Sequence, residues 1–347
     1  MSELLTGLDL GGAHLKLAQL RPDGVCVHAA QAACQLWRGL DRLDDALATL
    51  AKGAGPIDRV ALTMTGELAD LFPDRASGVA SLTAHMAALL PPGRLLVYAG
   101  RSGLLTPEAV LRAPLLAASM NWLASATAVA GLVPAGLFID MGSTTTDILV
   151  LRAGLVETDA QSDADRLESG ELVYVGLTRT PLMALAARAP VAGRWSGVMA
   201  ELFATTADIW RLLDVLDEAA DQHPAADGGA KSKAASRQRL ARMVGRDAGD
   251  LDSAQWDEVA RYFADRQLCA VEEGMAQILG RTPLPANAPL LGAGAGAALV
   301  ERLARRAGRP YLAAASLMPA EDDVGISSVA TCFPAVAVAR LLAARTA

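Results

Sequence analysis

Short, nearly continuous apolar runs recur along the chain and alternate with segments of helical periodicity. Such runs predict strands of a sheet that is covered on both faces. They span residues 4–10, 59–65, 95–99 and 137–141. Four leucines between the first two runs fall on one face of a predicted helix: Leu40, Leu43, Leu47 and Leu50. Strands that alternate with helices in this way predict an α/β fold.

The two halves of the chain begin alike. Residues 148–151 follow the fourth run as a strand, Gly154 predicts a turn, and a return strand starts at Val156. The first run is followed by a similar hairpin over residues 15–27, which turns at Asp23-Gly24. The chain of 347 residues also exceeds the usual size of a single core, so we expect two domains.

Residues 201–280 differ because their apolar residues recur at helical intervals, which predicts a mainly helical segment. A polar break over residues 225–233 interrupts the segment, and basic residues begin there. They are Lys231, Lys233, Arg237, Arg239, Arg242 and Arg246. A solvated loop and the exposed face of a helix explain such a run. The alternative is a cationic lid over an anionic substrate, since the run is unusually basic for an acidic protein.

The last part of the chain contains one more strand and a Gly-rich turn. Residues 289–291 lead into Gly292-Ala293-Gly294-Ala295-Gly296, and a helix then begins near Leu299 and stops near Gly308. We therefore expect four regions. They are a first domain at 1–115, the start of a second domain at 116–200, the helical segment with its basic loop at 201–280, and a return to the core with the Gly-rich loop and a C-terminal helix at 281–347.

Composition narrows the class of partner. The formal net charge of −7 argues against nucleic acid and anionic membrane surfaces, so we expect small-molecule substrates. Aromatic residues for an interface core are few, but Leu and Val can serve, which leaves a homo-oligomer open. The 4 cysteines have no CxxC spacing, which predicts reduced thiols. No basic region precedes an apolar core at the N-terminus, so a cytoplasmic location is expected.

The stretch from Ala113 to Ile139 carries no charge and is long enough to raise the question of a membrane span. It contains Ser, Asn, Thr, Gly and Pro, and it leads directly into an acidic loop. These features favour a buried, Ala-rich helix followed by a central strand.

An acid followed by small residues ends two of the predicted strands. The loops are Asp9-Leu10-Gly11-Gly12 and Asp140-Met141-Gly142-Ser143-Thr144-Thr145-Thr146-Asp147. Small residues let backbone N–H groups approach an anion, and the third Gly-rich turn opens a helix whose N-terminus favours negative charge. The set suits a polyphosphate. Asp9 and Asp140 then require a divalent cation between them, for which Mg²⁺ is the natural choice. Asp147 adds a third carboxylate or acts as a base.

Each loop taken alone also has a structural explanation. Residues 292–296 fit the close packing of a helix on a strand, residues 9–12 fit an ordinary turn, and the hydroxyls of residues 143–146 can cap a helix. The ordered set of three is more specific than any one of them. His14 and His85 have no metal-ligand partners near them in the sequence, and we expect both to be structural.

In this order the three loops resemble those of the actin, sugar kinase and Hsp70 superfamily. The resemblance implies a two-domain, actin-like ATPase fold of ribonuclease H-like type, with a ligand cleft between the domains and a helical insertion. A closer resemblance, to the hydantoinase A and oxoprolinase branch, rests on the second loop and on residues 169–181. Within that branch the chain is similar to a short-chain group tied to tetrahydromethanopterin-linked one-carbon metabolism. The matching segments are 64–68, 205–208, 226–228, 231–232 and 239–247.

In methanogens, members of that group build methanofuran. They join an aminomethylfuran-methyl diphosphate to the phenol of a γ-glutamyl-tyramine, which releases diphosphate and forms an aryl ether. The resemblance therefore implies a transferase in which the phosphate clamp holds the leaving group. For a methylotrophic bacterium it implies a related methylofuran, built on a tyrosine-type acceptor.

This hypothesis gives each candidate residue a role. Asp9 and Asp140 position Mg²⁺. The diphosphate is held by Gly11, Gly12, Lys16, Gly142, Ser143, Thr144, Thr145, Thr146, Arg179, Lys231, Gly292 and Gly294. One of three acids takes the proton of the phenol, namely Glu67, Asp147 or Glu171. Each of these acids also fits an exposed or salt-bridged carboxylate.

Two other functions share the same loops. The first is an ATP-dependent enzyme, either a kinase or an amide-ring opener such as the hydantoinases. The adenine side of the cleft has no sequence signal beyond the loop at Gly292, which argues against it. The second is a non-catalytic, nucleotide-dependent scaffold like the actin-related proteins.

Overall fold

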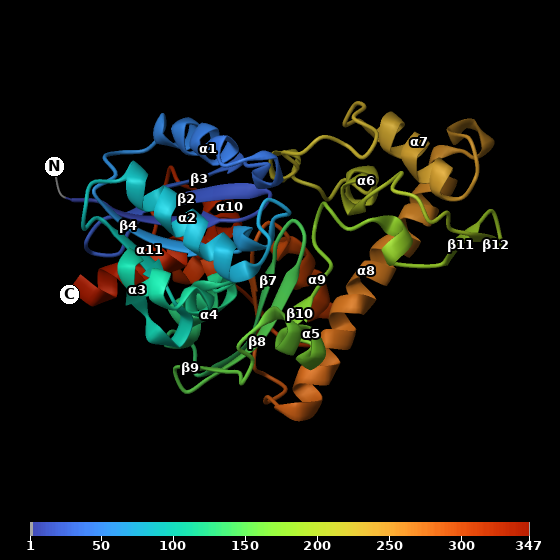
Figure 1. The fold of residues 1–347 in the computed structure, drawn as a ribbon. Helices are drawn as coiled ribbons and strands as arrows, with labels where there is room; N and C mark the ends of the chain where they lie inside the picture. The colour runs from blue at the N-terminus through green and yellow to red at the C-terminus, as the bar shows by residue number, and fades with distance from the viewer. Residues whose placement is uncertain (1–2, 347) are drawn as a thin grey trace.

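The computed structural model describes residues 3–346, which form two mixed sheets and the helices around them (Figure 1). The first sheet has the order β3-β2-β1-β4-β5-β6. Its strands are β1 (Leu5–Leu10), β2 (His14–Leu20), β3 (Cys26–Ala33), β4 (Arg59–Met64), β5 (Leu95–Tyr98) and β6 (Leu104–Leu105). Strand β1 runs antiparallel to β2 and parallel to β4. The first acidic loop and the end of β4 therefore meet at one edge of the sheet.

Three helices accompany this sheet: α1 (Asp41–Ala51), α2 (Arg75–Leu89) and α3 (Pro107–Arg112). Helix α1 buries Leu43, Ala46 and Leu50, which is the face that the leucine spacing predicted. These side chains share a core with the apolar positions of β1, β2 and β4. Asp74, which immediately precedes α2, caps the start of this helix by accepting a hydrogen bond from the backbone N–H of Ser77.

The second sheet repeats the hairpin of the first. Its order is β10-β8-β7-β13-β14, and β9 pairs with β8 outside that path. The strands are β7 (Ala135–Met141), β8 (Thr146–Arg152), β9 (Leu155–Glu157), β10 (Leu172–Val173), β13 (Leu290–Ala293) and β14 (Tyr311–Ala313). Strand β13 runs parallel to β7 and pairs Ala293 with Asp140. The third Gly-rich loop thus begins beside the second acidic loop.

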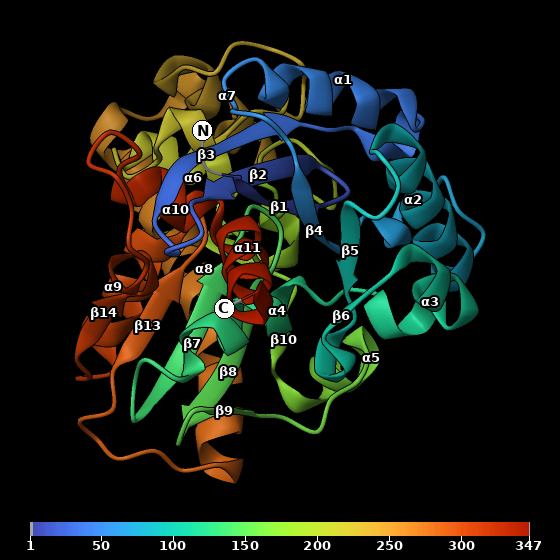
Figure 2. The same ribbon diagram turned by 90° about the vertical axis from the view of Figure 1, so that its left-hand side faces the viewer.

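Two apolar helices pack between the sheets, α4 (Asn121–Ala130) and α11 (Phe333–Thr346) (Figure 2). Helix α11 contacts α4 and the strands β1, β2 and β4 of the first sheet. Gly7 permits this approach, because a Cβ there would collide with the carbonyl of Ala335. The core around Phe138 and Phe333 consequently joins both sheets.

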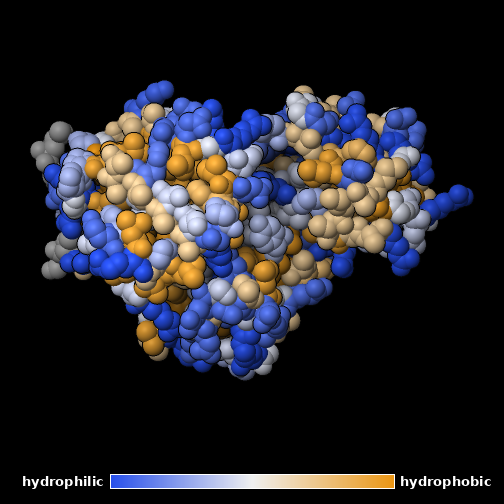
Figure 3. All heavy atoms as spheres, viewed as in Figure 1, coloured by the Kyte–Doolittle hydropathy of each residue, from blue (hydrophilic) through white to orange (hydrophobic). Residues whose placement is uncertain are grey.

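The helical segment lies to one side of the second sheet. It contains α6 (Thr206–Leu212), α7 (Lys233–Met243) and the long α8 (Ser253–Arg281), which runs along the sheet and carries the other two at its end (Figure 1). The remaining elements are a small hairpin of β11 (Arg188–Val191) and β12 (Arg194–Gly197), and the helices α5 (Asp163–Ser169), α9 (Ala297–Arg306) and α10 (Ile326–Thr331). The surface is hollowed between this segment and the first-sheet side (Figure 3).

The α/β fold, the paired hairpins and the mainly helical segment are confirmed. The uncharged stretch 113–139 forms buried α4 and central β7, as expected. No helix within residues 3–346 has the length and apolarity to cross a membrane. All 4 cysteines are free thiols. The boundaries between the four predicted regions stay a prediction. Helix α11, in the last of these regions, packs against the first sheet.

Candidate active site

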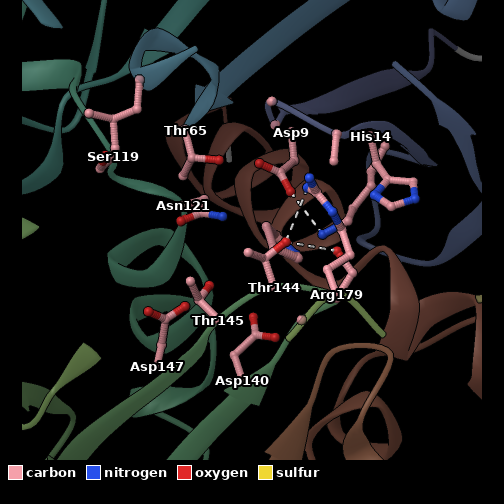
Figure 4. A pocket seen from close by; sticks show the side chains of 18 of the residues that line it. Asp9, His14, Thr65, Ser119, Asn121, Asp140, Thr144, Thr145, Asp147 and Arg179 are labelled. Carbon is pink, nitrogen blue, oxygen red and sulfur yellow. Dashed lines mark hydrogen bonds and ion pairs between the residues drawn. The ribbon is translucent and has the colours of Figure 1, made fainter. Parts of the chain in front are cut away.

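A cavity of about 540 Å³ opens where the two acidic loops face each other (Figure 4). Both loops, the end of β4, the start of α4 and the segment after β10 supply its wall. The structure brings eleven of the predicted residues together around it. They are Asp9, Gly11, Gly12, Lys16, Asp140, Gly142, Ser143, Thr144, Thr145, Asp147 and Arg179. The predicted loops therefore share one site.

Two buried carboxylates define the middle of the cavity. Asp9 is 2 % exposed and Asp140 is 6 % exposed. The hairpin pairs Asp9 with Lys16, whose Nζ lies 3.1 Å from Asp9 Oδ2. Burial opposes the charge of Lys16, but Asp9 and Asp140 outweigh it and raise the pKa of the ammonium. Burial and the neighbouring Asp147 raise the pKa of Asp140 to about 7.

The donor set fits a hard divalent cation, although no cluster of three or more His, Cys, Asp or Glu side chains suited to a metal occurs among residues 3–346. Asp9 Oδ1 is buried without a hydrogen-bond partner, which leaves one carboxylate oxygen available for a ligand. Asp140 faces the same space (Figure 4). Because Mg²⁺ is often bound by one or two carboxylates with waters and substrate phosphates, two aspartates suffice.

The second loop is held open by its own backbone and by the segment that follows β10. The amide of Gly142 donates to Thr145 O at 2.9 Å, and the amide of Arg179 donates to Ser143 O at 2.9 Å. Thr146 turns away from the cavity and donates to Val175 O at 2.6 Å. Thr146 therefore anchors the loop, while Ser143 to Thr145 face the cavity.

Arg179 brings positive charge to the same wall. Its guanidinium lies 5.7 Å from the ring centre of Trp37 and donates to Thr144 Oγ1 at 3.4 Å. Within residues 3–346 no carboxylate pairs with it, so an incoming anion would be its first counter-charge. Burial lowers the pKa of this group, which increases the electrostatic gain from binding an anion.

The third Gly-rich loop acts through packing. A Cβ on Gly294, which has φ +80°, would collide with the carbonyl of Met141 and with Asp140. A Cβ on Gly292 would lie 2.7 Å from the ring of Tyr311. Ala295 is the residue of this loop that lines the cavity, so Gly292 and Gly294 support the strand that carries Asp140.

Asp147 lies on the cavity wall at the start of β8 (Figure 4). It forms a buried ion pair with Arg166, whose guanidinium stacks 4.3 Å from the ring centre of Trp122. Burial raises the pKa of Asp147, and Arg166 opposes the rise. The carboxyl is thus oriented on the cavity surface.

Glu67 does not line the cavity, but it accepts a hydrogen bond from Ser119, which does. Ser119 Oγ lies 2.6 Å from Glu67 Oε1 and 3.0 Å from Asp163 Oδ2, so one hydroxyl bridges two carboxyl groups. Asp163 already accepts from Arg75 at 3.1 Å, whereas Glu67 is 1 % exposed and its Oε2 has no partner. Burial raises the pKa of Glu67, and the hydrogen bond from Ser119 and the charge of Arg75 oppose the rise.

Comparison with known proteins identifies the family of this chain. The family model for hydantoinase/oxoprolinase matches residues 58–317, which is most of the chain. The chain belongs to the hydantoinase/oxoprolinase family.

Two curated relatives are synthases of a furan-methanamine that carries a γ-glutamylaminoethyl-phenoxymethyl group. The protein of Methanocaldococcus jannaschii is 30% identical over 283 residues, which cover 81% of this chain and 83% of that protein. The protein of Methanococcus vannielii is 34% identical over 122 residues, or 35% of this chain and 53% of that protein. An acetone carboxylase in a nucleotide-free structure matches with a TM-score of 0.57 at 10% identity, over 98% of this chain and 70% of that one. The fold is the actin-like, two-domain fold.

The hydantoinase/oxoprolinase match contains the second and third loops but begins after the first loop. Two further predicted residues inside it also lie away from the cavity. Glu171 accepts hydrogen bonds from Thr158 at 2.6 Å and from Arg281 at 3.0 Å. Lys231 forms an ion pair with Asp221 at 3.4 Å. Local partners account for both side chains.

The basic run of the helical segment is largely neutralised within that segment. Arg239 is fully buried and binds Asp208 at 2.8 Å and Asp227 at 3.1 Å. Lys233 pairs with Asp214, and Arg242 pairs with Asp227 at 3.4 Å. Arg239 therefore belongs to neither an exposed helix face nor a lid, since its charge is used inside the core.

Several cavity residues had no role in the sequence-based site. Thr65, Asn121, Trp37 and Tyr174 line the wall, and Thr65 and Asn121 are drawn in Figure 4. His14 also lines it; burial, His223, Lys16 and Arg179 together lower the pKa of His14 to about 2, so the ring is neutral. Trp37, which stands between Leu36 and Arg38 outside any apolar period, is the one that the sequence could have indicated.

Proposed function

We propose that this protein forms an aryl ether in methanofuran or methylofuran biosynthesis. It joins an aminomethylfuran-methyl diphosphate to the phenol of a γ-glutamyl-tyramine or tyrosine-type acceptor and releases diphosphate. The proposal rests on two features of one cavity. Arg179 lines it without a carboxylate partner among the described residues, and Asp9 has a carboxylate oxygen without a hydrogen-bond partner. This combination suits a diphosphate with a cation, and the named relatives supply the reaction class.

In this mechanism the first two loops bind the diphosphate through backbone N–H groups, and Lys16 and Arg179 neutralise its charge. Mg²⁺, when held by Asp9 and Asp140, would supply further charge stabilisation for the departing diphosphate. The furfuryl C–O bond breaks with its electron pair remaining on diphosphate. A lone pair of the phenol oxygen forms the new C–O bond, and the phenol proton leaves to a carboxylate.

The geometry favours Asp147 as the acceptor of that proton. It is the one candidate base among the three that lines the cavity. Arg166 opposes the rise of its pKa that burial causes, and the ion pair fixes the direction of the carboxyl. Glu67 is buried behind Ser119, which donates to it, and Glu171 accepts hydrogen bonds from Arg281 and Thr158.

The test mixes the purified protein with Mg²⁺, a furfuryl diphosphate and a phenolic acceptor, and follows ether and diphosphate by mass spectrometry. Ether and diphosphate in equal amounts are expected. ATP turnover without ether would instead favour the kinase or hydantoinase-like activity, and the absence of both would favour a scaffold.

Two variants sharpen the assignment of roles. Asp147→Asn should lower the rate of ether formation by about 10²–10⁴-fold, the range of general base catalysis, and should retain binding of diphosphate. Asp23→Asn is the matched control, because Asp23 lies at the exposed turn between β2 and β3 and its side chain is 61% exposed. Full activity of Asp147→Asn would remove that residue from the role of base.

A further inference from the structure

Aromatic side chains are exposed at the mouth of the cavity, in a chain that is only 4% aromatic. Among residues 3–346 the exposed large aromatics are Trp37 at 37%, Tyr174 at 66% and Trp195 at 58%. Trp37 and Tyr174 both line the cavity. Trp195 lies on β12, where it stacks with Tyr262 and Arg188. Because exposed aromatic surface is costly unless a partner covers it, the pair at the cavity needs an explanation.

The two rings come from opposite walls. Trp37 belongs to the short 3-10 turn Leu36–Arg38 after β3, and Leu68 ends the neighbouring turn Gly66–Leu68 after β4. The turns are in contact, since a Cβ on Gly66 would lie 2.7 Å from Leu36 Cδ2. Leu68, which is 53% exposed, also lines the cavity. The first-sheet wall therefore presents an aromatic ring and an aliphatic side chain from two adjoining turns.

Tyr174 stands on the wall of the second sheet. It follows β10, two residues before Gly176, whose missing side chain lets the chain pack on Ser143 and Thr144. Tyr174 is therefore tied to the loop that is proposed to grip the diphosphate. Arg179 links the two walls, because its guanidinium lies over Trp37 at 5.7 Å while its backbone amide binds Ser143 O.

We propose that Trp37, Leu68 and Tyr174 form the binding site for the aromatic ring of the acceptor, a phenol whose polar tail extends out of the cavity into solvent. The assignment rests on the proposed function, which requires a phenol beside the diphosphate. The inner part of the cavity is polar and charged, so it suits the anion, and the apolar mouth suits the ring. Because the mouth of the cavity is open to solvent, the polar tail of the acceptor stays hydrated and contributes little to binding. The aromatic ring of the acceptor contributes most of the binding.

The first experiment measures binding without catalysis. Trp122, Trp210 and Trp256 are fully buried, so in a Trp195→Phe background Trp37 is the exposed tryptophan. The tryptophan is excited at a wavelength that tyramine does not absorb. Added tyramine should then quench the tryptophan fluorescence in a saturable way. The added substitution Trp37→Phe should abolish the quenching, and a non-aromatic amine should cause none. Saturable quenching that survives Trp37→Phe would overturn the assignment.

The second experiment measures steady-state kinetics. Trp37→Ala and Tyr174→Ala should each raise KM for the phenol about tenfold, the equivalent of about 1.4 kcal/mol, with KM for the furfuryl diphosphate unchanged. Tyr174→Phe retains the ring and should restore the KM, whereas Trp195→Ala is the remote control. Tyramine and its γ-glutamyl derivative should differ little in KM. An increase confined to KM for the diphosphate would instead place the furan ring at the mouth and overturn the proposal.

The two proposals fail in different ways. Ether formation with an unaltered phenol KM in both alanine variants would keep the synthase and reject this ring site. Quenching of Trp37 by tyramine without any ether would keep the ring site and reject the synthase.

Discussion

Replacing Asp140 by asparagine should stabilise the metal-free protein at neutral and alkaline pH. Asp140 is 6 % exposed, and burial with the nearby Asp147 raises its pKa to about 7, well above the ordinary value of about 4 for an aspartate. The folded state thus binds a proton more tightly than the unfolded state. Wild-type stability therefore falls as pH rises from about 4 through about 7, and the loss is complete above the folded pKa.

The size of the effect follows from the same shift. A rise of the pKa from about 4 to about 7 lowers the free energy of unfolding by about 4 kcal/mol at pH 8 and by about 1 kcal/mol near pH 4.5. The neutral amide removes this pH-dependent loss. The gain of Asp140→Asn over the wild type should consequently grow by about 3 kcal/mol across that interval. For a chain of this length, that gain is roughly a 4 °C rise in Tm.

Urea unfolding in the presence of EDTA at both pH values measures the difference. Asp23→Asn is the control, because its exposed carboxyl should leave the difference independent of pH. A stability difference for Asp140→Asn that stays constant or shrinks as pH rises would refute the burial argument. The variant should form no ether, since it lacks one of the carboxylates proposed to hold Mg²⁺.

Three further substitutions test the packing and protonation around the site. Arg239→Met should lower the free energy of unfolding by about 3–5 kcal/mol, because it breaks the buried Arg239–Asp208 ion pair and leaves Asp208 with the more distant Arg211 at 3.7 Å; chemical denaturation measures this, and a loss below about 1 kcal/mol would contradict it. Gly294→Ala should cost more than about 2 kcal/mol, since φ is +80° and the Cβ collides with the Met141 carbonyl, whereas Gly12→Ala, with no atom within 4 Å of the Cβ, should unfold at nearly the wild-type temperature. Because burial raises the pKa of Glu67, Glu67→Gln should remove a carboxylic-acid C=O band from the infrared spectrum at pH 7; an unchanged spectrum would show that Glu67 is ionised in spite of its burial.

The sequence determined the elements that depend on local spacing. The apolar runs before Asp9 and Asp140 became β1 and β7, and the turns after them became the paired hairpins. Short-range patterns suffice for this, because the periodicity of burial and the preferences of Gly and Asp act within a few residues. They also placed the two acidic loops, which meet at one cavity.

The tertiary structure decided which charges are free to act. Within residues 3–346, Arg179 has no carboxylate partner, whereas Lys231 and Glu171 are paired with opposite charges. The sequence does not show which of these three charged side chains is paired. Trp37 and Tyr174 converge from different sheets, so no local pattern relates them. Burial and pairing are sums over contacts between residues far apart in the chain. For this reason the sequence could predict the site's location and the acidic loops that line it, but the burial of Glu67, the raised pKa of Asp140 and the exposed aromatic side chains at the cavity required the fold.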